Sequence, residues 1–217
     1  MKQKIYVWDP IVRIFHWMLV IAFTTAYFTG GEKTLVHQYA GYIVFGLLAM
    51  RVLWGFVGTR HARFSDFVRP PRQAIEYVKG LASGKVKDYV GHNPAGGWMV
   101  IALLVSLSFT GVTGLMVFGT KGHGPLAPYM ASFGKPASGA MAKQDPLPAI
   151  ARDEGEEGHK KHESVAEEVL EDVHDFLANF TLFLIGLHLT GVVLSSYRHR
   201  QNLVRAMVTG YKEEAAP

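Results

Sequence analysis

Residues 173–197 read VHDFLANFTLFLIGLHLTGVVLSSY, an apolar run long enough to cross a membrane as one helix. Two histidines interrupt this run, His174 and His188, and they are 14 residues apart. At about 100° and 1.5 Å per residue, both imidazoles fall on nearly the same helix face, roughly 21 Å apart along the axis. One helix therefore presents a histidine near each side of a bilayer, where an ionisable residue is costly and marks a functional site by default.

Three further apolar runs precede this one, at about residues 11–30, 35–57 and 98–118. With the last run, at about 172–197, they predict an all-α integral membrane protein, a four-helix bundle. The composition agrees, because apolar residues make up 49% of the chain and charged residues only 18%, against roughly 25% charged in soluble domains. We expect residues 1–217 to form a single four-span domain.

The chain contains no cysteine. This excludes disulfides, thiolate zinc sites, iron–sulfur clusters and covalently attached c-type haem within it, because all of these need sulfur ligands or a CxxCH attachment site. Any redox centre must therefore be held by other side chains.

Charge is divided unequally between the two sides of the predicted bundle. The side with the N-terminus, the loop 51–97 and the tail after residue 197 carries 15 Lys and Arg against six Asp and Glu, and the opposite side carries seven against twelve. Because basic loops stay in the cytoplasm, we expect a multi-pass protein of a bacterial inner (cytoplasmic) membrane with both termini cytoplasmic. The pI near 9.2 then reflects topology and contacts with membrane lipid, and it implies no nucleic acid partner.

The segments between the runs differ in kind. Residues 72–82, after a Pro-Pro break, predict a short surface helix, and residues 165–175 predict a helical extension into the fourth span. The stretch 119–164 is rich in Gly, Pro and Ala and then acidic, so we expect an outer loop that is partly disordered. The acidic residues 153–157 suit the attraction of a basic partner.

Topology sorts four histidines into two pairs. His16, near the start of the outward-running first span, and His188, in the inward-running fourth span, both fall in the cytoplasmic half. His37, at the start of the second span, and His174 both fall on the outer side. Each pair can clamp an iron from opposite faces of a flat macrocycle. Such bis-imidazole ligation leaves no open iron position, which suits electron transfer rather than oxygen chemistry.

A single histidine in a span is more often a packing residue or a member of a proton relay than a haem ligand. The alternative from a different class is therefore a haem-free, His-lined metal or proton transporter. Two observations favour the haem: the four histidines pair by depth and by helix, and the span interiors lack the carboxylates that a metal transporter would use.

The sequence resembles the bacterial cytochrome b561 / Ni,Fe-hydrogenase b-type cytochrome family over nearly the whole chain except residues 119–164. Four segments carry the resemblance: Asp9-Pro10 with Arg13 and His16-Trp17; Arg51-Val52-Leu53-Trp54-Gly55; Gly91-His92-Asn93-Pro94; and Val173-His174 with Gly186-Leu187-His188. The family implies two non-covalent b haems between four helices. His16 and His188 would ligate the iron on the cytoplasmic side, and His37 and His174 the iron on the periplasmic side.

The resemblance also implies what the protein does. Electrons would cross the bilayer between the quinone pool, with quinone or quinol as substrate, and an extracytoplasmic redox partner such as a periplasmic cytochrome c. Residues 191–196 with 202–204 are similar to the branch found beside di-haem cytochromes c. Within the same fold, the chain could instead be the membrane anchor subunit of a hydrogenase or dehydrogenase, or a superoxide:quinone oxidoreductase. It could also form a homodimer.

Other residues have two interpretations each. Arg13 and Arg51, near the cytoplasmic level, could bind haem propionates, or they could only snorkel to the interface and set the topology. His92 is a candidate contact to a quinone or a propionate. We expect His61 and His199 to be solvated. The outer-loop histidines, His123, His159 and His162, are expected to be solvated too, or a His-x-x-His pair among them could bind a metal weakly. Six glycines could admit a macrocycle to the backbone, or could equally mark close helix packing: Gly41, Gly46, Gly111, Gly114, Gly186 and Gly191.

Overall fold

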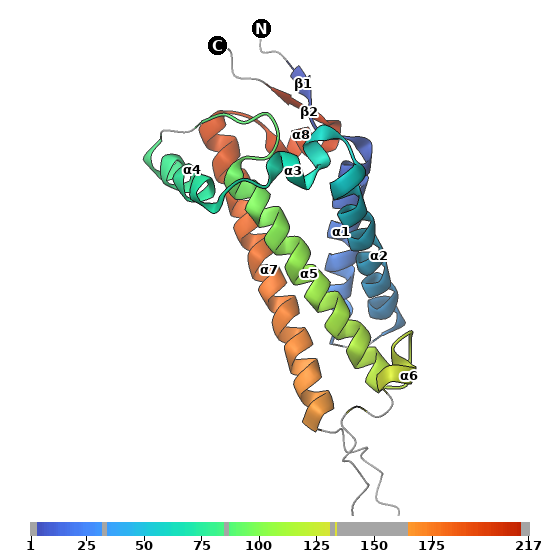
Figure 1. The fold of residues 1–217 in the computed structure, drawn as a ribbon. Helices are drawn as coiled ribbons and strands as arrows, with labels where there is room; N and C mark the ends of the chain where they lie inside the picture. The colour runs from blue at the N-terminus through green and yellow to red at the C-terminus, as the bar shows by residue number, and fades with distance from the viewer. Residues whose placement is uncertain (1–3, 32–33, 85–86, 131–132, 134–164, 214–217) are drawn as a thin grey trace, which may run out of the picture. The chain divides into compact units, whose positions relative to one another are not determined.

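The structure is a computed structural model, and it describes residues 4–31, 34–84, 87–130, 133 and 165–213. These residues fall into two compact units, one within residues 1–112 and 175–217 and the other within residues 113–174. Four helices are long and apolar enough to cross a membrane (Figure 1). They are α1 (Pro10–Thr29), α2 (Leu35–Val57), α5 (Pro94–Thr120) and α7 (Val165–His199). The prediction of an all-α, multi-pass membrane protein is confirmed.

Two of the helices extend beyond the spans expected from hydropathy. α5 begins at Pro94 because the side chain of Asn93 accepts the N–H of Gly96 at 2.7 Å, and because proline suits the first position of a helix. α7 begins at Val165, so the extension predicted before the fourth span is confirmed. The Asn-Pro of the Gly91–Pro94 segment thus has a local structural role in starting α5.

The two ends of the described chain lie side by side (Figure 1). Strand β1 (Lys4–Tyr6) pairs antiparallel with β2 (Tyr211–Glu213), so that Ile5 faces Lys212. The short helix α8 (Leu203–Thr209) leads into β2 and ends at Gly210, whose φ of 87° favours glycine. Gly210 also accepts the N–H groups of Val7 and Trp8. Strands of three residues are too short to have been predicted from sequence periodicity.

Three short helices follow α2 in the loop between the second and third spans: η1 (Arg60–Ala62), α3 (Phe64–Phe67) and α4 (Pro71–Ser83). α4 confirms the helix predicted at 72–82. It buries Tyr77 and Leu81 on one face. In the second unit, α6 (Ala127–Met130) follows α5. The acidic residues 153–157 and most of the predicted outer loop lie outside the described residues.

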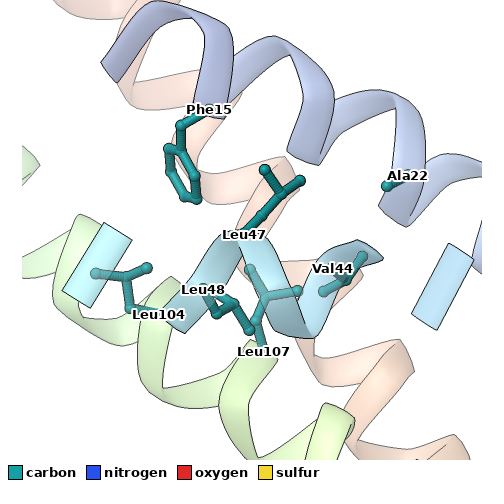
Figure 2. Close-up of a cluster of buried hydrophobic side chains, with 7 residues drawn as sticks. All are labelled: Phe15, Ala22, Val44, Leu47, Leu48, Leu104 and Leu107. Carbon is teal, nitrogen blue, oxygen red and sulfur yellow. The ribbon is translucent and has the colours of Figure 1, made fainter. Parts of the chain in front are cut away.

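The apolar core of the larger unit joins three of the long helices. Figure 2 shows the seven buried side chains that form it: Phe15 and Ala22 from α1, Val44, Leu47 and Leu48 from α2, and Leu104 and Leu107 from α5. The last span is tied to α5 by a polar contact, because the hydroxyl groups of Ser106 and Thr181 lie 2.7 Å apart and both side chains are buried.

A buried carboxylate joins the start of α1 to the end of α2. Asp9 caps α1 by accepting the N–H of Val12 at 2.9 Å. It also accepts the indole N–H of Trp54 at 3.2 Å and the hydroxyl of Thr59. Burial acts to raise the pKa of Asp9, but these hydrogen bonds outweigh it and the pKa is lowered. Asp9 and Trp54, which the sequence analysis quoted without a role, therefore hold these two helix ends together.

Candidate functional site

The structure brings together the two histidines predicted for the cytoplasmic side. His16 lies in the second turn of α1, and His188 lies in the second half of α7. Their imidazoles are within electrostatic range of each other. His16 Nδ1 is buried and has no hydrogen-bond partner among the described residues. A buried nitrogen without a hydrogen-bond partner costs folding free energy unless a further group binds it.

His37 is held by the helix next to it. It lies in the first turn of α2, where the side chain of Thr34 caps the helix by accepting the N–H of His37. Its Nδ1 lies 2.8 Å from the carbonyl oxygen of Ala26 on α1. A carbonyl only accepts hydrogen bonds, so His37 must donate from Nδ1, and the neutral ring then carries its lone pair on Nε2. A metal-ligating histidine typically donates its other N–H in this way.

His174 lies in the second unit, and its surroundings come from the end of α5. The hydroxyl of Thr113 lies 3.2 Å from His174 Nδ1. A Cβ at Gly114 would lie 2.9 Å from Cε1 of the same ring, so the imidazole sits against the bare backbone of α5. Because His37 and His174 belong to different units, their pairing stays a prediction.

The six glycines named in the sequence analysis divide into two kinds. A Cβ at Gly111 would lie 3.0 Å from the ring of Phe45, so Gly111 and Gly114 are sites of close packing. A Cβ at any of the other four would meet no atom of the described residues within 4 Å: Gly41, Gly46, Gly186 and Gly191. Gly186 lies two residues from His188, and Gly41 lies four from His37. Open space beside imidazole donors fits a flat iron macrocycle.

Arg51 is buried and does not snorkel to the interface. It is 3% exposed, donates from Nη2 to the carbonyl of Ala62 at 3.1 Å, and lies over the rings of Phe64 and Phe67. Its Nη1 has no hydrogen-bond partner among the described residues. The interpretation as a snorkelling residue is therefore wrong for Arg51, whereas binding of a propionate stays a prediction.

Arg13 contacts the C-terminal part of the chain. Its Nη1 donates to the carbonyl of Val208 in α8 at 2.7 Å. Within the described residues, its buried Nε has no partner. Arg13 thus holds α8 against α1. Its contact with a propionate, through Nε, stays a prediction.

His92 packs between two aromatic rings, Trp8 at 4.5 Å and Phe67 at 4.7 Å between centroids. Burial, together with the positive charge of Arg51 and the nearby His188, lowers the pKa of His92 to about 3. The ring is therefore neutral at physiological pH. In the part of the chain that the structure describes, its buried Nδ1 has no hydrogen-bond partner. His92 lies within electrostatic range of both Arg51 and the proposed ligand His188.

The expectation that His61 and His199 are solvated is wrong. His61 Nδ1 lies 3.1 Å from a carboxylate oxygen of Asp66. The His199 side chain is only 10% exposed, pairs with Asp88, and stacks on Tyr77 with ring planes 7° apart. Both rings lie in basic segments that suggested exposure, and the carboxylate partners became evident only in the folded chain.

Comparisons with known proteins identify a family and several relatives. The sequence profile of the family described as prokaryotic cytochrome b561 matches residues 7–210. No solved structure matches the chain. Curated relatives match it over about half of its length, and the matching part spans about three fifths of theirs.

Three of these relatives illustrate the likeness. The chain is 28% identical over 146 residues to a protein of Rhizobium leguminosarum bv. viciae, covering 54% of this chain and 61% of that protein. It is 32% identical over 146 residues to one of Azotobacter chroococcum mcd 1, covering 54% and 60%. Both are named "Probable Ni/Fe-hydrogenase B-type cytochrome subunit". The "Probable Ni/Fe-hydrogenase 1 B-type cytochrome subunit" of Escherichia coli (strain K12) is 29% identical over 141 residues, covering 52% and 60%.

The family match covers all four long helices and every histidine discussed above, and it ends just short of the strands β1 and β2. It is a family of b-type cytochromes, so the cofactor it implies is haem b. The chain belongs to the prokaryotic cytochrome b561 family.

Proposed function

We propose that the chain is a di-haem b-type cytochrome that carries electrons across the bacterial inner membrane between quinone and an extracytoplasmic redox partner. The observation that carries the proposal is the placement of His16 and His188. They come from the first and last long helices, lie within electrostatic range, and include a buried imidazole nitrogen that lacks a partner among the described residues. His37 and His174 are proposed to hold the second haem.

The chain's own residues have clear tasks in this proposal. His37, donating from Nδ1 to Ala26, would ligate through Nε2. Arg13 and Arg51 would bind propionates through their buried nitrogens, and the apolar helices would exclude water. The haem would supply one-electron redox chemistry, and His16 with His188, and His37 with His174, would hold it.

The proposed orientation places both termini in the cytoplasm. The excess of Lys and Arg on the side of the termini supports this. The pairing of β1 with β2 supports the part of this proposal that has both termini on one side, because paired strands lie on the same side of a membrane. In this orientation the His16 and His188 haem is on the cytoplasmic side and the His37 and His174 haem on the periplasmic side.

A second candidate function concerns the partner. The names of the curated relatives favour the membrane cytochrome subunit of a Ni/Fe-hydrogenase, which would deliver electrons to the chain in place of a cytochrome c. Purification from native membranes with mild detergent separates the two candidates. Copurification of a nickel-containing hydrogenase supports the second, and copurification of a cytochrome c supports the first.

A visible spectrum of the purified protein tests the proposed function itself. We expect sharp reduced-minus-oxidised bands of low-spin b haem, about two haems per chain, and complete removal of the haem by acid–acetone. We also expect a quinol analogue to reduce the haem. A protein without haem, or with haem that quinol does not reduce, contradicts the proposal, and the haem-free result favours a metal or proton transporter.

A further inference from the structure

Four side chains form a hydrogen-bonded series at the end of the larger unit that carries both chain ends. The carboxylate of Asp88 pairs with His199 Nδ1. His199 Nε2 lies 3.1 Å from the Tyr77 hydroxyl, and this hydroxyl lies 3.2 Å from Ser195 Oγ. Tyr77 comes from α4, Asp88 from the loop after α4, and Ser195 and His199 from the end of α7. We call these four residues the Asp88–Ser195 series.

The series runs from water to the interior. The Asp88 side chain is 52% exposed and that of His199 10%, whereas Tyr77 is 7% and Ser195 4% exposed. A cavity of about 110 Å³ adjoins the outer end and is lined by Asp88, Gln201 and Lys212 among others. A cavity of this size, with polar side chains in part of its wall, has room for water. The outer carboxylate is therefore open to water, and the inner hydroxyl is shielded from it.

Every member can both give and accept a proton. An imidazole takes a proton at one nitrogen and releases one from the other, and the hydroxyls of Tyr77 and Ser195 are donors and acceptors at once. Burial raises the pKa of Tyr77, so the phenol keeps its proton at neutral pH. Tyr77 stacks on His199 with ring planes 7° apart, so the two rings are held parallel to each other.

The inner end of the series lies on the same face of α7 as His188. Ser195 follows His188 by seven residues, which is within about 20° of two full turns, so both lie on the same helix face about 10 Å apart along the axis. We propose that Asp88, His199, Tyr77 and Ser195 form a proton-transfer chain between the cavity and the interior beside His188. This inference rests on the proposed function, because an electron reaching a buried haem raises the proton affinity of groups near it.

The proton balance of one transfer is simple. Asp88 takes a proton from water and passes it to His199 Nδ1, and His199 releases its Nε2 proton to the Tyr77 oxygen. Tyr77 then passes its hydroxyl proton to Ser195 Oγ, and Ser195 would release its own proton inward, where the propionate of a haem held by His188 would accept it. One proton enters and one is delivered for each electron that arrives, and oxidation reverses the direction.

Photoreduction of the holoprotein tests the chain without quinone. A ruthenium bipyridyl dye supplies electrons but no protons, and a pH indicator reports protons taken from water. Tyr77→Phe keeps the ring and removes the hydroxyl in the middle of the series. We expect proton uptake about 100-fold slower than in the wild type, because positioned proton-transfer groups are worth about 10²–10⁴-fold, with an unchanged rate of haem reduction. Tyr197→Phe is the matched control, since Tyr197 lies between Ser195 and His199 on α7 but is 76% exposed and outside the series.

The outcomes separate a proton path from a structural tie between α4 and α7. If Tyr77→Phe takes up protons at the wild-type rate but melts at a lower temperature, the series only joins α4 to α7, and the inference is overturned. Asp88→Asn is a second variant for the case that Tyr77→Phe does not fold, because Asp88 is at the exposed end of the series. It should slow proton uptake in the same way. A wild-type holoprotein that takes up no protons overturns the inference but leaves the proposed function standing, because the haem bands and haem content are measured separately. A protein without haem contradicts both.

Discussion

His37 donates its Nδ1–H to the backbone carbonyl of Ala26 across 2.8 Å, joining the first turn of α2 to the last turns of α1. The acceptor is part of the backbone, so the bond persists whatever side chain residue 26 carries. It assigns the proton of the neutral ring to Nδ1, which leaves the lone pair on Nε2. The orientation that a ligand needs is thus built into the α1–α2 contact.

The first prediction tests the pairing of the four histidines. His16→Ala and His188→Ala should remove, or convert to high spin, the same spectral component, and His37→Ala and His174→Ala should remove the other. The reason is geometric: imidazole nitrogens on one iron lie only about 4 Å apart, since each iron–nitrogen bond is about 2 Å. Redox titration of each variant, followed by its visible spectrum, measures which component is lost.

The control for this experiment is the second haem, the one whose ligands are unchanged, measured in variants that still fold. Loss of one component while the other keeps its wild-type potential shows a local effect. If His16→Ala and His37→Ala deplete the same component while His188→Ala spares it, the proposed pairing is wrong.

The second prediction concerns the hydroxyl beside His174. Thr113→Val removes the group 3.2 Å from His174 Nδ1 while keeping the shape of the side chain. Loss of such an orienting partner typically weakens metal binding about 10–100-fold. We expect weaker retention of the His174 haem, measured as the haem lost during dilution in detergent. Thr120→Val on the same helix is the control, because its hydroxyl donates to the carbonyl of Val117. Equal haem loss in both variants would argue against a ligand role for His174.

The third prediction uses the open space beside Gly186. A leucine side chain there would meet no described residue near its Cβ, so Gly186→Leu should leave the melting temperature of the apoprotein unchanged. If a haem occupies this space, the same change should sharply lower the haem bound per chain, measured by pyridine haemochrome. Val193→Leu, at a position 67% exposed on the same helix, should bind haem normally. Full haem content in Gly186→Leu would show that the space faces lipid.

The fourth prediction concerns acid stability. The pKa of His92 falls from 6.5 to about 3 in the folded protein, mainly by burial. Below pH 6.5 the unfolded chain binds a proton that the folded chain does not, so stability is lost as pH falls, by about 1.4 kcal/mol per pH unit down to about pH 3. His92→Gln should remove this contribution and make the melting temperature less steeply dependent on pH between 7 and 5.

The comparison for His92 is an exposed histidine. His123 is exposed and its ring stacks on that of Phe118, so His123→Gln is the reference for replacing a histidine outside the buried site. An identical pH dependence in His92→Gln and the wild type would mean that His92 is protonated in the folded protein.

The sequence by itself determined the long helices and the positions of the histidines along them. Apolar length and the 3.6-residue period are local properties, so α1, α2, α5 and α7 and the shared face of His174 and His188 could be predicted. The short helix α4 and the extension of α7 followed from the same local signals. The charge asymmetry likewise depends only on which loops carry Lys and Arg.

The tertiary structure alone decided the contacts between residues far apart in the chain. No periodicity indicates that Arg51 is buried over Phe64, that His199 meets Asp88 and Tyr77, or that three residues at each end of the chain form a strand pair. Each of these depends on which groups folding removes from water and which partners it then places within hydrogen-bond reach. A buried polar group must find a partner, and its partner is set by the packing of helices rather than by neighbours in the sequence.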